Sequence, residues 1–317
     1  MKALCQRFSL AILALSLTAC ASAPVVNTLA LQPPSQPPSG TLVGACGNAD
    51  PTASCVHEVP QGWTMMTAGA RATGPELLMN ESVKRSLLIK RHEVTQDEWA
   101  WLMDSAPSFF SDCPDCPVER VSWWDALAYL NRLSIADGFQ PCYEMQACSG
   151  TPGGGCPNGR PWCESRFRCE KVAYRGEQCT GYRLPTEHEW RWISDATSSS
   201  PEVVSFPWCA DISRGQPRPV TRTLDGTVDG IAGNVWEWTW SEEDKAGRRA
   251  HRGGSFRTSP KECDANAQSA ALPEMRYYFV GFRPMRTLPL SRPRHIQAPQ
   301  RDTASASRGK STPSTLP

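Results

Sequence analysis

The chain has 317 residues, and its 33 lysines and arginines nearly balance its 32 aspartates and glutamates, which gives a formal net charge of +1. The basic residues are also scattered along the chain. Because a protein that binds nucleic acid usually has a positive net charge or a basic patch, we expect no nucleic-acid partner. The length is sufficient for one large hydrophobic core or two modest ones.

The N-terminal segment 1–19 has the pattern of an export signal. After a positively charged start, residues 8–19 form an apolar run that is too short to remain as a membrane-spanning helix. The run leads into the sequence LTAC, which resembles the lipobox of bacterial lipoproteins, where cleavage precedes a cysteine that is then acylated. This resemblance implies that Cys20 carries the lipid, whereas the alternative is an ordinary signal peptide with an incidental cysteine. Ala21 in place of an aspartate implies sorting to the outer membrane, facing the periplasm or the surface.

The rest of the chain divides into three parts by composition. Residues 20–44 combine the lipidated cysteine with a linker rich in proline and serine, which cannot bury apolar surface. Residues 45–287 form the predicted domain, which contains a cysteine-rich insertion at 142–179. Residues 288–317 have almost no large apolar side chain, which predicts a disordered tail.

Three helix starts are visible within the predicted domain. Thr95, Ser122 and Thr186 each precede an acidic residue three positions later, as in a capping box, and apolar residues follow at helical spacing. The sequence SLLIKRHEV before the first helix predicts a strand. Residues 194–287 consist of glycine, proline and short apolar pieces, which indicates loops joined by short strands.

The cysteines predict disulfides. Of 14 cysteines, Cys5 leaves with the signal and Cys20 takes the lipid, so 12 remain, an even number in an oxidising compartment. Six of them lie in the segment 142–179, which predicts a stapled insertion with little core of its own. We expect Cys113 and Cys116 to form a structural disulfide. A zinc site would need a second pair of ligands at suitable spacing, and none is apparent. A redox-active pair normally lies at the start of a helix, which prolines interrupt here.

Several longer motifs occur in one order along the chain. They are HEVTQDEW, VERVSWWDALAYLNRLS, GYRLPTEHEWRW and DGIAGNVWEWTW, followed by HRGGSF and VGFRPM. Together they resemble the sulfatase-modifying factor family, which includes the formylglycine-generating enzymes. The resemblance covers about residues 56–287. It implies an irregular α+β fold of the C-type-lectin-like type, with few helices, short strands and long disulfide-stapled loops.

The family resemblance implies a calcium site at the GNVWEW motif. Hard oxygen ligands, including main-chain carbonyls and a carboxylate, suit calcium. Carried over to this chain, the candidate ligands are Ala232, Gly233, Val235 and Glu237. The alternative is that Glu237 pairs with an arginine, either Arg252 or Arg283.

The same resemblance bears on catalysis. In formylglycine-generating enzymes two cysteines near the RGGS motif bind copper(I), and their positions here correspond to Thr258 and Cys263. Ser255 matches the active-site serine, so Ser255 and Cys263 are the candidate catalytic residues. A threonine hydroxyl does not replace a thiolate as a ligand of copper(I). We therefore expect copper chemistry to fail and Cys263 to be buried as a free thiol or joined in a disulfide, with Cys209 as a candidate partner.

The histidines do not supply another metal site at the sequence level. Their spacing lacks the patterns of a helix-borne iron triad, and we expect surface or capping positions for them. The five are His57, His92, His188, His251 and His295.

We therefore expect a lipid-anchored protein of the cell envelope that acts in binding or assembly, with an envelope protein or a glycan as its partner. One alternative is an enzyme that oxidises a sulfatase cysteine to formylglycine, or a related metal-dependent oxidase. Another alternative is a structural lipoprotein of the wall.

Overall fold

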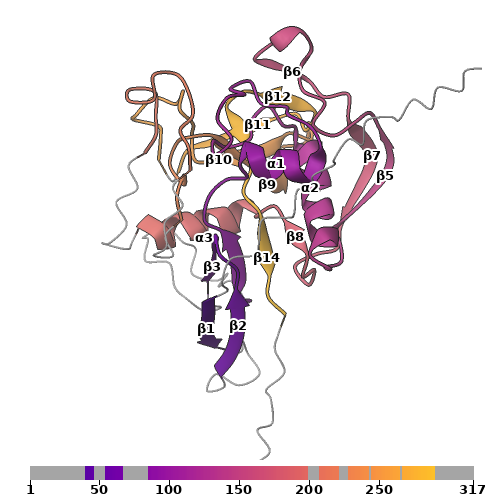
Figure 1. Cartoon of the computed structure of the whole chain (residues 1–317), viewed down its shortest axis with the longest axis vertical. Helices are drawn as coiled ribbons and strands as arrows, with labels where there is room; N and C mark the ends of the chain where they lie inside the picture. The colour runs from indigo at the N-terminus through magenta and orange to yellow at the C-terminus, as the bar shows by residue number, and fades with distance from the viewer. Residues whose placement is uncertain are drawn as a thin grey trace, which may run out of the picture. The chain divides into compact units, whose positions relative to one another are not determined.

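The computed structural model in Figure 1 describes residues 40–45, 54–66, 85–198, 207–220, 228–242, 244–264 and 266–289. These residues fall within one compact unit, 37–317. The export segment, Cys20, most of the linker and the tail beyond residue 289 lie outside them, so the lipid anchor stays a prediction. Among the residues described, no helix has the length and apolar character needed to cross a membrane.

The three helices of the described part begin where the sequence predicts. They are α1 (Gln96–Met103), α2 (Trp123–Ala136) and α3 (Glu187–Ser198). Thr95 accepts a hydrogen bond from the main-chain amide of Glu98, whose carboxylate in turn accepts from the Thr95 amide. The same reciprocal pair forms at the start of the other two helices. These boxes satisfy amide groups that the first helical turn leaves without partners.

Two four-stranded sheets form the centre of the domain. The first has the order β11-β10-β9-β13, with antiparallel neighbours except for the parallel pair of β13 and β9. Its strands are β9 (Trp236–Glu242), β10 (Arg249–Arg252), β11 (Gln268–Ala271) and β13 (Val280–Gly281). The second sheet is antiparallel, with the order β3-β4-β14-β8. Its strands are β3 (Trp63–Met66), β4 (Leu87–Lys90), β14 (Met285–Thr287) and β8 (Tyr182–Arg183).

Three antiparallel strand pairs complete the described elements. They are β1 (Gly40–Ala45) with β2 (Ser54–Val59), β5 (Tyr143–Ser149) with β7 (Arg168–Tyr174), and β6 (Trp162–Glu164) with β12 (Met275–Tyr277); a short 3-10 turn, η1, spans Pro157–Gly159. β1 begins inside the segment 20–44, which the sequence predicts as linker. This end of the linker is instead a strand, because Gly40–Ala45 pairs residue by residue with β2.

Buried aromatic rings form much of the core. Trp99, Trp123 and Trp238 belong to the larger apolar cluster, whereas Trp190 belongs to a smaller one with residues of β4 and β14. All four indoles are fully buried. Their N–H groups donate to acceptors inside the fold, for example Trp123 to the Thr239 carbonyl and Trp238 to the Val121 carbonyl. The irregular loops are therefore fixed by large rings whose polar groups are satisfied.

The cysteine-rich insertion is stapled as predicted. Its three disulfides are Cys142–Cys179, Cys148–Cys169 and Cys156–Cys163. β5 and β7 form a hairpin that Figure 1 shows beside α2. The expectation of little core is wrong for the base of this hairpin, because Cys142, Tyr143 and Cys179 are buried in the larger cluster. The side chain of Asn131 on α2 fixes the base of the hairpin, because it donates to the Tyr143 carbonyl and accepts from the Tyr143 amide.

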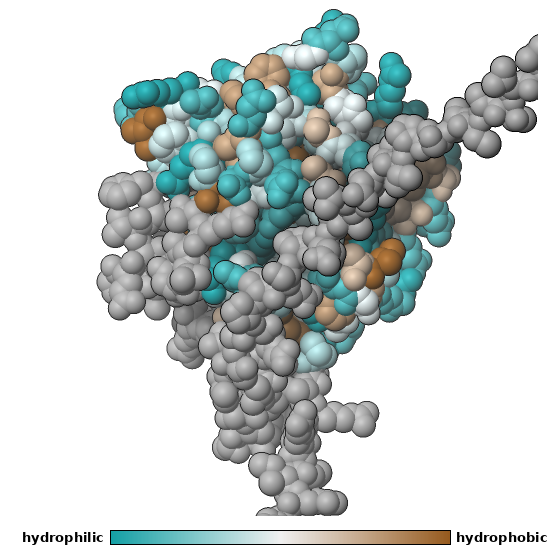
Figure 2. All heavy atoms as spheres, viewed as in Figure 1, coloured by the Kyte–Doolittle hydropathy of each residue, from teal (hydrophilic) through white to brown (hydrophobic). Residues whose placement is uncertain are grey.

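Exposed apolar side chains are dispersed over the face seen in Figure 2. Brown residues occur there as separate spots in a surface that is mainly teal and white. Trp101 and Trp162 are the exposed tryptophans of the described part, at 50% and 56%. Scattered single residues of this kind need no partner, so only a position beside a cavity gives an exposed tryptophan functional weight.

Candidate functional site

A pocket with a cavity volume of about 520 Å³ lies where the insertion meets the C-terminal part of the domain. Ligand-binding clefts for small molecules typically measure about 300–1,000 Å³. The residues lining it are Pro161, Trp162, Trp236, Ser255, Arg257, Thr258, Tyr277, Tyr278 and Phe279. Five of these nine are aromatic, and among the described residues of the lining Arg257 alone carries a full charge at neutral pH.

The aromatic side of the pocket is assembled from three strands. Trp162 of β6 stands directly opposite Tyr277 of β12 in the antiparallel pair. The ring of Tyr277 stacks on that of Phe279, with centroids 5.2 Å apart and planes 16° from parallel. The amide of Trp236, at the start of β9, donates to the Phe279 carbonyl. Rings from distant parts of the sequence therefore line one side of a single cavity.

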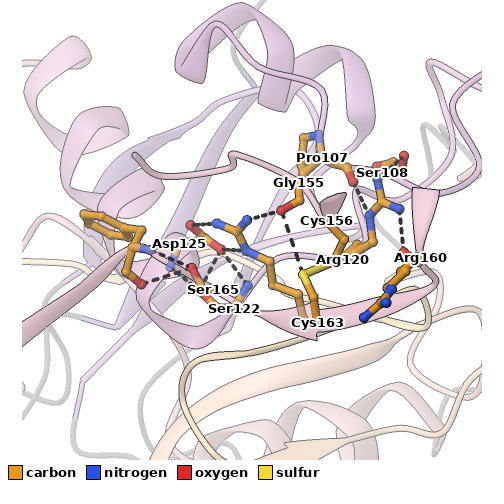
Figure 3. Close-up of a disulfide and its surroundings, with 12 residues drawn as sticks. Pro107, Ser108, Arg120, Ser122, Asp125, Gly155, Cys156, Arg160, Cys163 and Ser165 are labelled. Carbon is orange, nitrogen blue, oxygen red and sulfur yellow. Dashed lines mark hydrogen bonds and ion pairs between the residues drawn. A yellow bond between two sulfur atoms is a disulfide. The ribbon is translucent and has the colours of Figure 1, made fainter. Parts of the chain in front are cut away.

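The loop that carries Trp162 is held from several directions. Figure 3 shows the Cys156–Cys163 disulfide that closes this loop, with the Arg120 side chain directed at the carbonyl groups around it. Arg120 donates to the carbonyls of Pro107, Ser108 and Arg160 at 2.6, 3.4 and 2.8 Å. The Trp162 ring is thus exposed on a fixed support.

A buried ion pair holds the other end of the same loop. The Arg276 guanidinium donates to both carboxylate oxygens of Asp125, at 2.8 and 2.9 Å, and to the Gly155 carbonyl at 2.6 Å. Both side chains are buried, and Asp125 also serves in the capping box of α2. The insertion is therefore tied directly to a core helix.

The polar side of the pocket contains Ser255 and Thr258. The Ser255 amide donates to the Thr258 hydroxyl at 2.9 Å, and the two hydroxyl oxygens lie 3.3 Å apart. Cys263 lies behind them, buried and joined to Cys209 in a disulfide. A Cβ placed on Gly254 would lie 3.3 Å from the Cys263 sulfur and 3.5 Å from the Thr258 Cβ, so the two candidate copper positions are neighbours. This donor set does not fit copper(I), because it offers a hydroxyl and an oxidised sulfur.

Glu237 forms the arginine pair that the sequence analysis left as the alternative to calcium. Both of its oxygens accept from the Arg283 guanidinium at 2.6–3.1 Å, and one also accepts from Trp190 Nε1 at 2.8 Å. Glu237 and Arg283 are both fully buried. A calcium ion could use this carboxylate only if Arg283 moved away, so calcium binding stays a prediction.

The main chain of the other predicted calcium ligands joins two loops. The Ala232 carbonyl accepts from the Trp208 amide, and the Gly233 amide donates to the Gly253 carbonyl. Val235 is fully buried. No cluster of three or more histidine, cysteine, aspartate or glutamate side chains suited to a metal ion is found within the described ranges.

Glu93 is a buried carboxyl that sequence reasoning missed. It is fully buried, and neither of its oxygens has a hydrogen-bond partner among the residues described. A Cβ on Gly230, whose φ is +72°, would lie 2.5 Å from a Glu93 oxygen, so the glycine lets the carboxyl fit. Burial raises the pKa of Glu93 to about 8, an effect that Arg283 opposes and Glu237 reinforces. Glu93 is therefore mostly protonated at neutral pH.

Two histidines differ from the sequence-based expectation of surface or capping positions. His92 and His251 are only 5% and 3% exposed, because they lie on strands or turns that pack into the core. His251 contacts the rings of Trp236 and Trp238 edge-on. Burial lowers the pKa of His251 to about 3 and that of His92 to about 4. Both are neutral at physiological pH, and His251 packs against Trp236, which lines the pocket.

Residues 48–288 match the sulfatase-modifying factor enzyme 1-like domain of the FGE-sulfatase family. The chain belongs to this family. It is 26% identical over 207 residues to the chaperone protein LppX of Paenibacillus barcinonensis. This match covers 56% of this chain and 70% of LppX. Two solved structures share the fold. The variable protein 1 of Treponema denticola is 24% identical to this chain, with a TM-score of 0.55, and the match covers 80% of this chain and 100% of that protein. CarF is 23% identical, with a TM-score of 0.53, and the match covers 73% of this chain and 99% of CarF.

The sequence-based site and the observed pocket overlap in part. Ser255 and Thr258 line the pocket, and Cys263 lies directly behind it. Glu237 is in the core instead, paired with Arg283. The aromatic wall was missed, because Trp162 lies in the cysteine-rich insertion and only the β6–β12 pairing brings it to the pocket. The signal that could have identified it is the position of Trp162 between two closely spaced cysteines, Cys156 and Cys163.

Proposed function

We propose that this family member is a lipid-anchored protein of the cell envelope that binds a ligand in the aromatic pocket and does not act as a copper oxidase. The observation that carries the proposal is the state of Cys263, whose sulfur is bonded to Cys209. Thr258 occupies the other position that the oxidase chemistry requires. Copper(I) selects soft thiolate ligands, and this site provides none.

Several further features support a binding role at the envelope. The disulfides of the described part suit an oxidising compartment, and the lipobox-like sequence ending in Cys20 suits attachment to a membrane. The relative named as a chaperone protein favours a role in binding or assembly over one in oxidation. The pocket is rigidly framed, as a site that binds without rearranging needs to be.

The proposal is tested with the full chain purified in detergent and incubated with copper(I), oxygen and a sulfatase-type cysteine peptide. Mass spectrometry of the peptide should show the cysteine unchanged. Binding of copper(I) should also be no stronger in the wild-type chain than in a variant that carries both Cys209→Ser and Cys263→Ser, which leaves no thiol at this position. Formation of the aldehyde would establish the oxidase alternative and refute the proposal.

A further inference from the structure

The chemistry of the pocket indicates which class of ligand it takes, and this inference rests on the binding role proposed above. We infer that the pocket binds an acidic saccharide, with a sugar ring stacked on Trp162 and Tyr277 and a carboxylate held by Arg257. The inference depends on three properties of the site: the presentation of its rings, the donors it offers and the use of its main chain.

The rings are presented as open faces. Trp162 is 56% exposed even though the Cys156–Cys163 disulfide and the Arg120 contacts fix the loop that carries it. Holding a large ring in water costs hydrophobic stabilisation, since burial of such a ring is favourable. Tyr277, directly across the strand pair, extends the same surface. A flat ligand with apolar C–H groups on its face would cover both rings.

The polar groups of the pocket are mainly donors. Indole and guanidinium groups only donate hydrogen bonds, and the tyrosine and threonine hydroxyls can do so. Arg257 is exposed, and its guanidinium lies 5.3 Å from the centre of the Tyr278 ring, so it is placed over the aromatic surface. Among the described residues, none with a carboxylate lines the pocket, which disfavours a cationic ligand. A guanidinium matches the geometry of a carboxylate, and a sugar supplies many further oxygen acceptors.

The main chain around the pocket argues against an extended peptide. Peptides that bind as an added strand require free amide and carbonyl groups along an edge. Here the Tyr278 amide donates to the Pro161 carbonyl, the Phe279 carbonyl accepts from Trp236, and the Thr258 carbonyl accepts from the Ala210 amide. These main-chain groups are therefore not available to a ligand, which favours recognition by side chains and suits a compact ring in a cavity of about 520 Å³.

The inference is tested by measuring dissociation constants for two probes with the full chain in a zwitterionic detergent, because sugar-headed detergents would compete. The probes are a disaccharide of glucuronic acid and glucose and the uncharged disaccharide of two glucose units. We expect the acidic probe to bind about tenfold more tightly or better, a ratio well outside the error of such titrations. Saturation-transfer NMR should show contact between sugar protons and aromatic protons of the protein.

Single substitutions in the pocket test which side chains contact the probes. Trp162→Ala should weaken the acidic probe about tenfold or more, whereas Trp162→Phe, which keeps a ring, should retain most of the affinity. Trp101→Ala is the matched control, because Trp101 is similarly exposed, at 50%, but lies on α1 outside the lining. Arg257→Gln should abolish the preference for the acidic probe and leave the binding of the neutral one.

Equal binding of the two disaccharides, the absence of binding by either, or unchanged affinity in Trp162→Ala would overturn the inference. Stronger binding of benzoate than of the acidic disaccharide would also overturn it, in favour of a simple aromatic acid. None of these results produces an aldehyde on the cysteine peptide. Failure of this inference is therefore distinguishable from failure of the proposed function.

Discussion

Removing one partner of the buried pair of Arg283 and Glu237 should destabilise the domain strongly. Arg283 donates to both oxygens of Glu237 and also to the carbonyls of Lys90 and Asp229. Arg283→Met leaves a fully buried carboxylate whose remaining recorded donor is Trp190, together with two carbonyls that lose a donor. Breaking a buried pair from one side typically costs about 3–5 kcal/mol. For a domain of this size each kcal/mol lowers the melting temperature by about 2–4 °C, so we expect a fall of about 10 °C.

Thermal unfolding of the full chain, followed by tryptophan fluorescence, measures this effect. Arg248→Met is the matched control, because Arg248 pairs with Asp244 on the surface and its removal should leave the melting temperature nearly unchanged. Replacing both buried partners by Glu237→Leu and Arg283→Met should recover part of the loss. A melting temperature for Arg283→Met equal to that of the control would refute the reasoning and mean that another group neutralises Glu237.

Three more predictions follow from the same contacts. Glu93→Gln should reduce the loss of stability between about pH 5 and 8 without abolishing it. Burial raises the pKa of Glu93 in the folded state to about 8, above the ordinary value of 4.5, so the stability that its neutral form contributes is present below pH 4.5 and is lost as pH rises through 8; Glu119, whose pKa burial also raises to about 8, keeps a similar dependence in the variant. Urea unfolding at several pH values checks this, and an unchanged slope in the variant would contradict it. Thr258→Cys combined with Cys209→Ser should create tight copper(I) binding, because two thiols would then be neighbours beside Gly254. Competition with a copper(I) chelator measures this binding against that of the control, Thr258→Ser with Cys209→Ser. Calcium should leave the melting temperature of the wild type unchanged if Arg283 keeps its place on the Glu237 carboxylate, whereas a rise that a chelator reverses would confirm the calcium prediction.

Local signals in the sequence were sufficient for the helices, for the Cys113–Cys116 disulfide and for the presence, though not the pairing, of disulfides in the insertion. The capping boxes at Thr95, Ser122 and Thr186 mark helix starts because each is completed by residues three positions apart. The Cys113–Cys116 disulfide is confirmed for a similar reason, since four residues suffice to close it. The family motifs also fixed the fold class, which the matching domain and the shared fold of the solved structures confirm.

The tertiary structure decided what those motifs do. Glu237 had two candidate partners at the sequence level, and only the packing of β9 against the loop before β14 places the Arg283 guanidinium on it. The Cys209–Cys263 pairing was one of two outcomes for Cys263, since the two residues are 54 positions apart and chain spacing says nothing about their proximity.

The sequence by itself determined the family, the helix starts, the stapled character of the insertion and the absence of a second cysteine at position 258, because each depends on residue identity or on neighbours along the chain. The aromatic pocket was decided by the tertiary structure alone. Its rings come from residues 162, 236 and 277–279, and the β6–β12 pairing, with the Arg120 and Arg276 contacts, brings them together. Long-range pairing of this kind depends on the free energy of the whole fold, which no local pattern records.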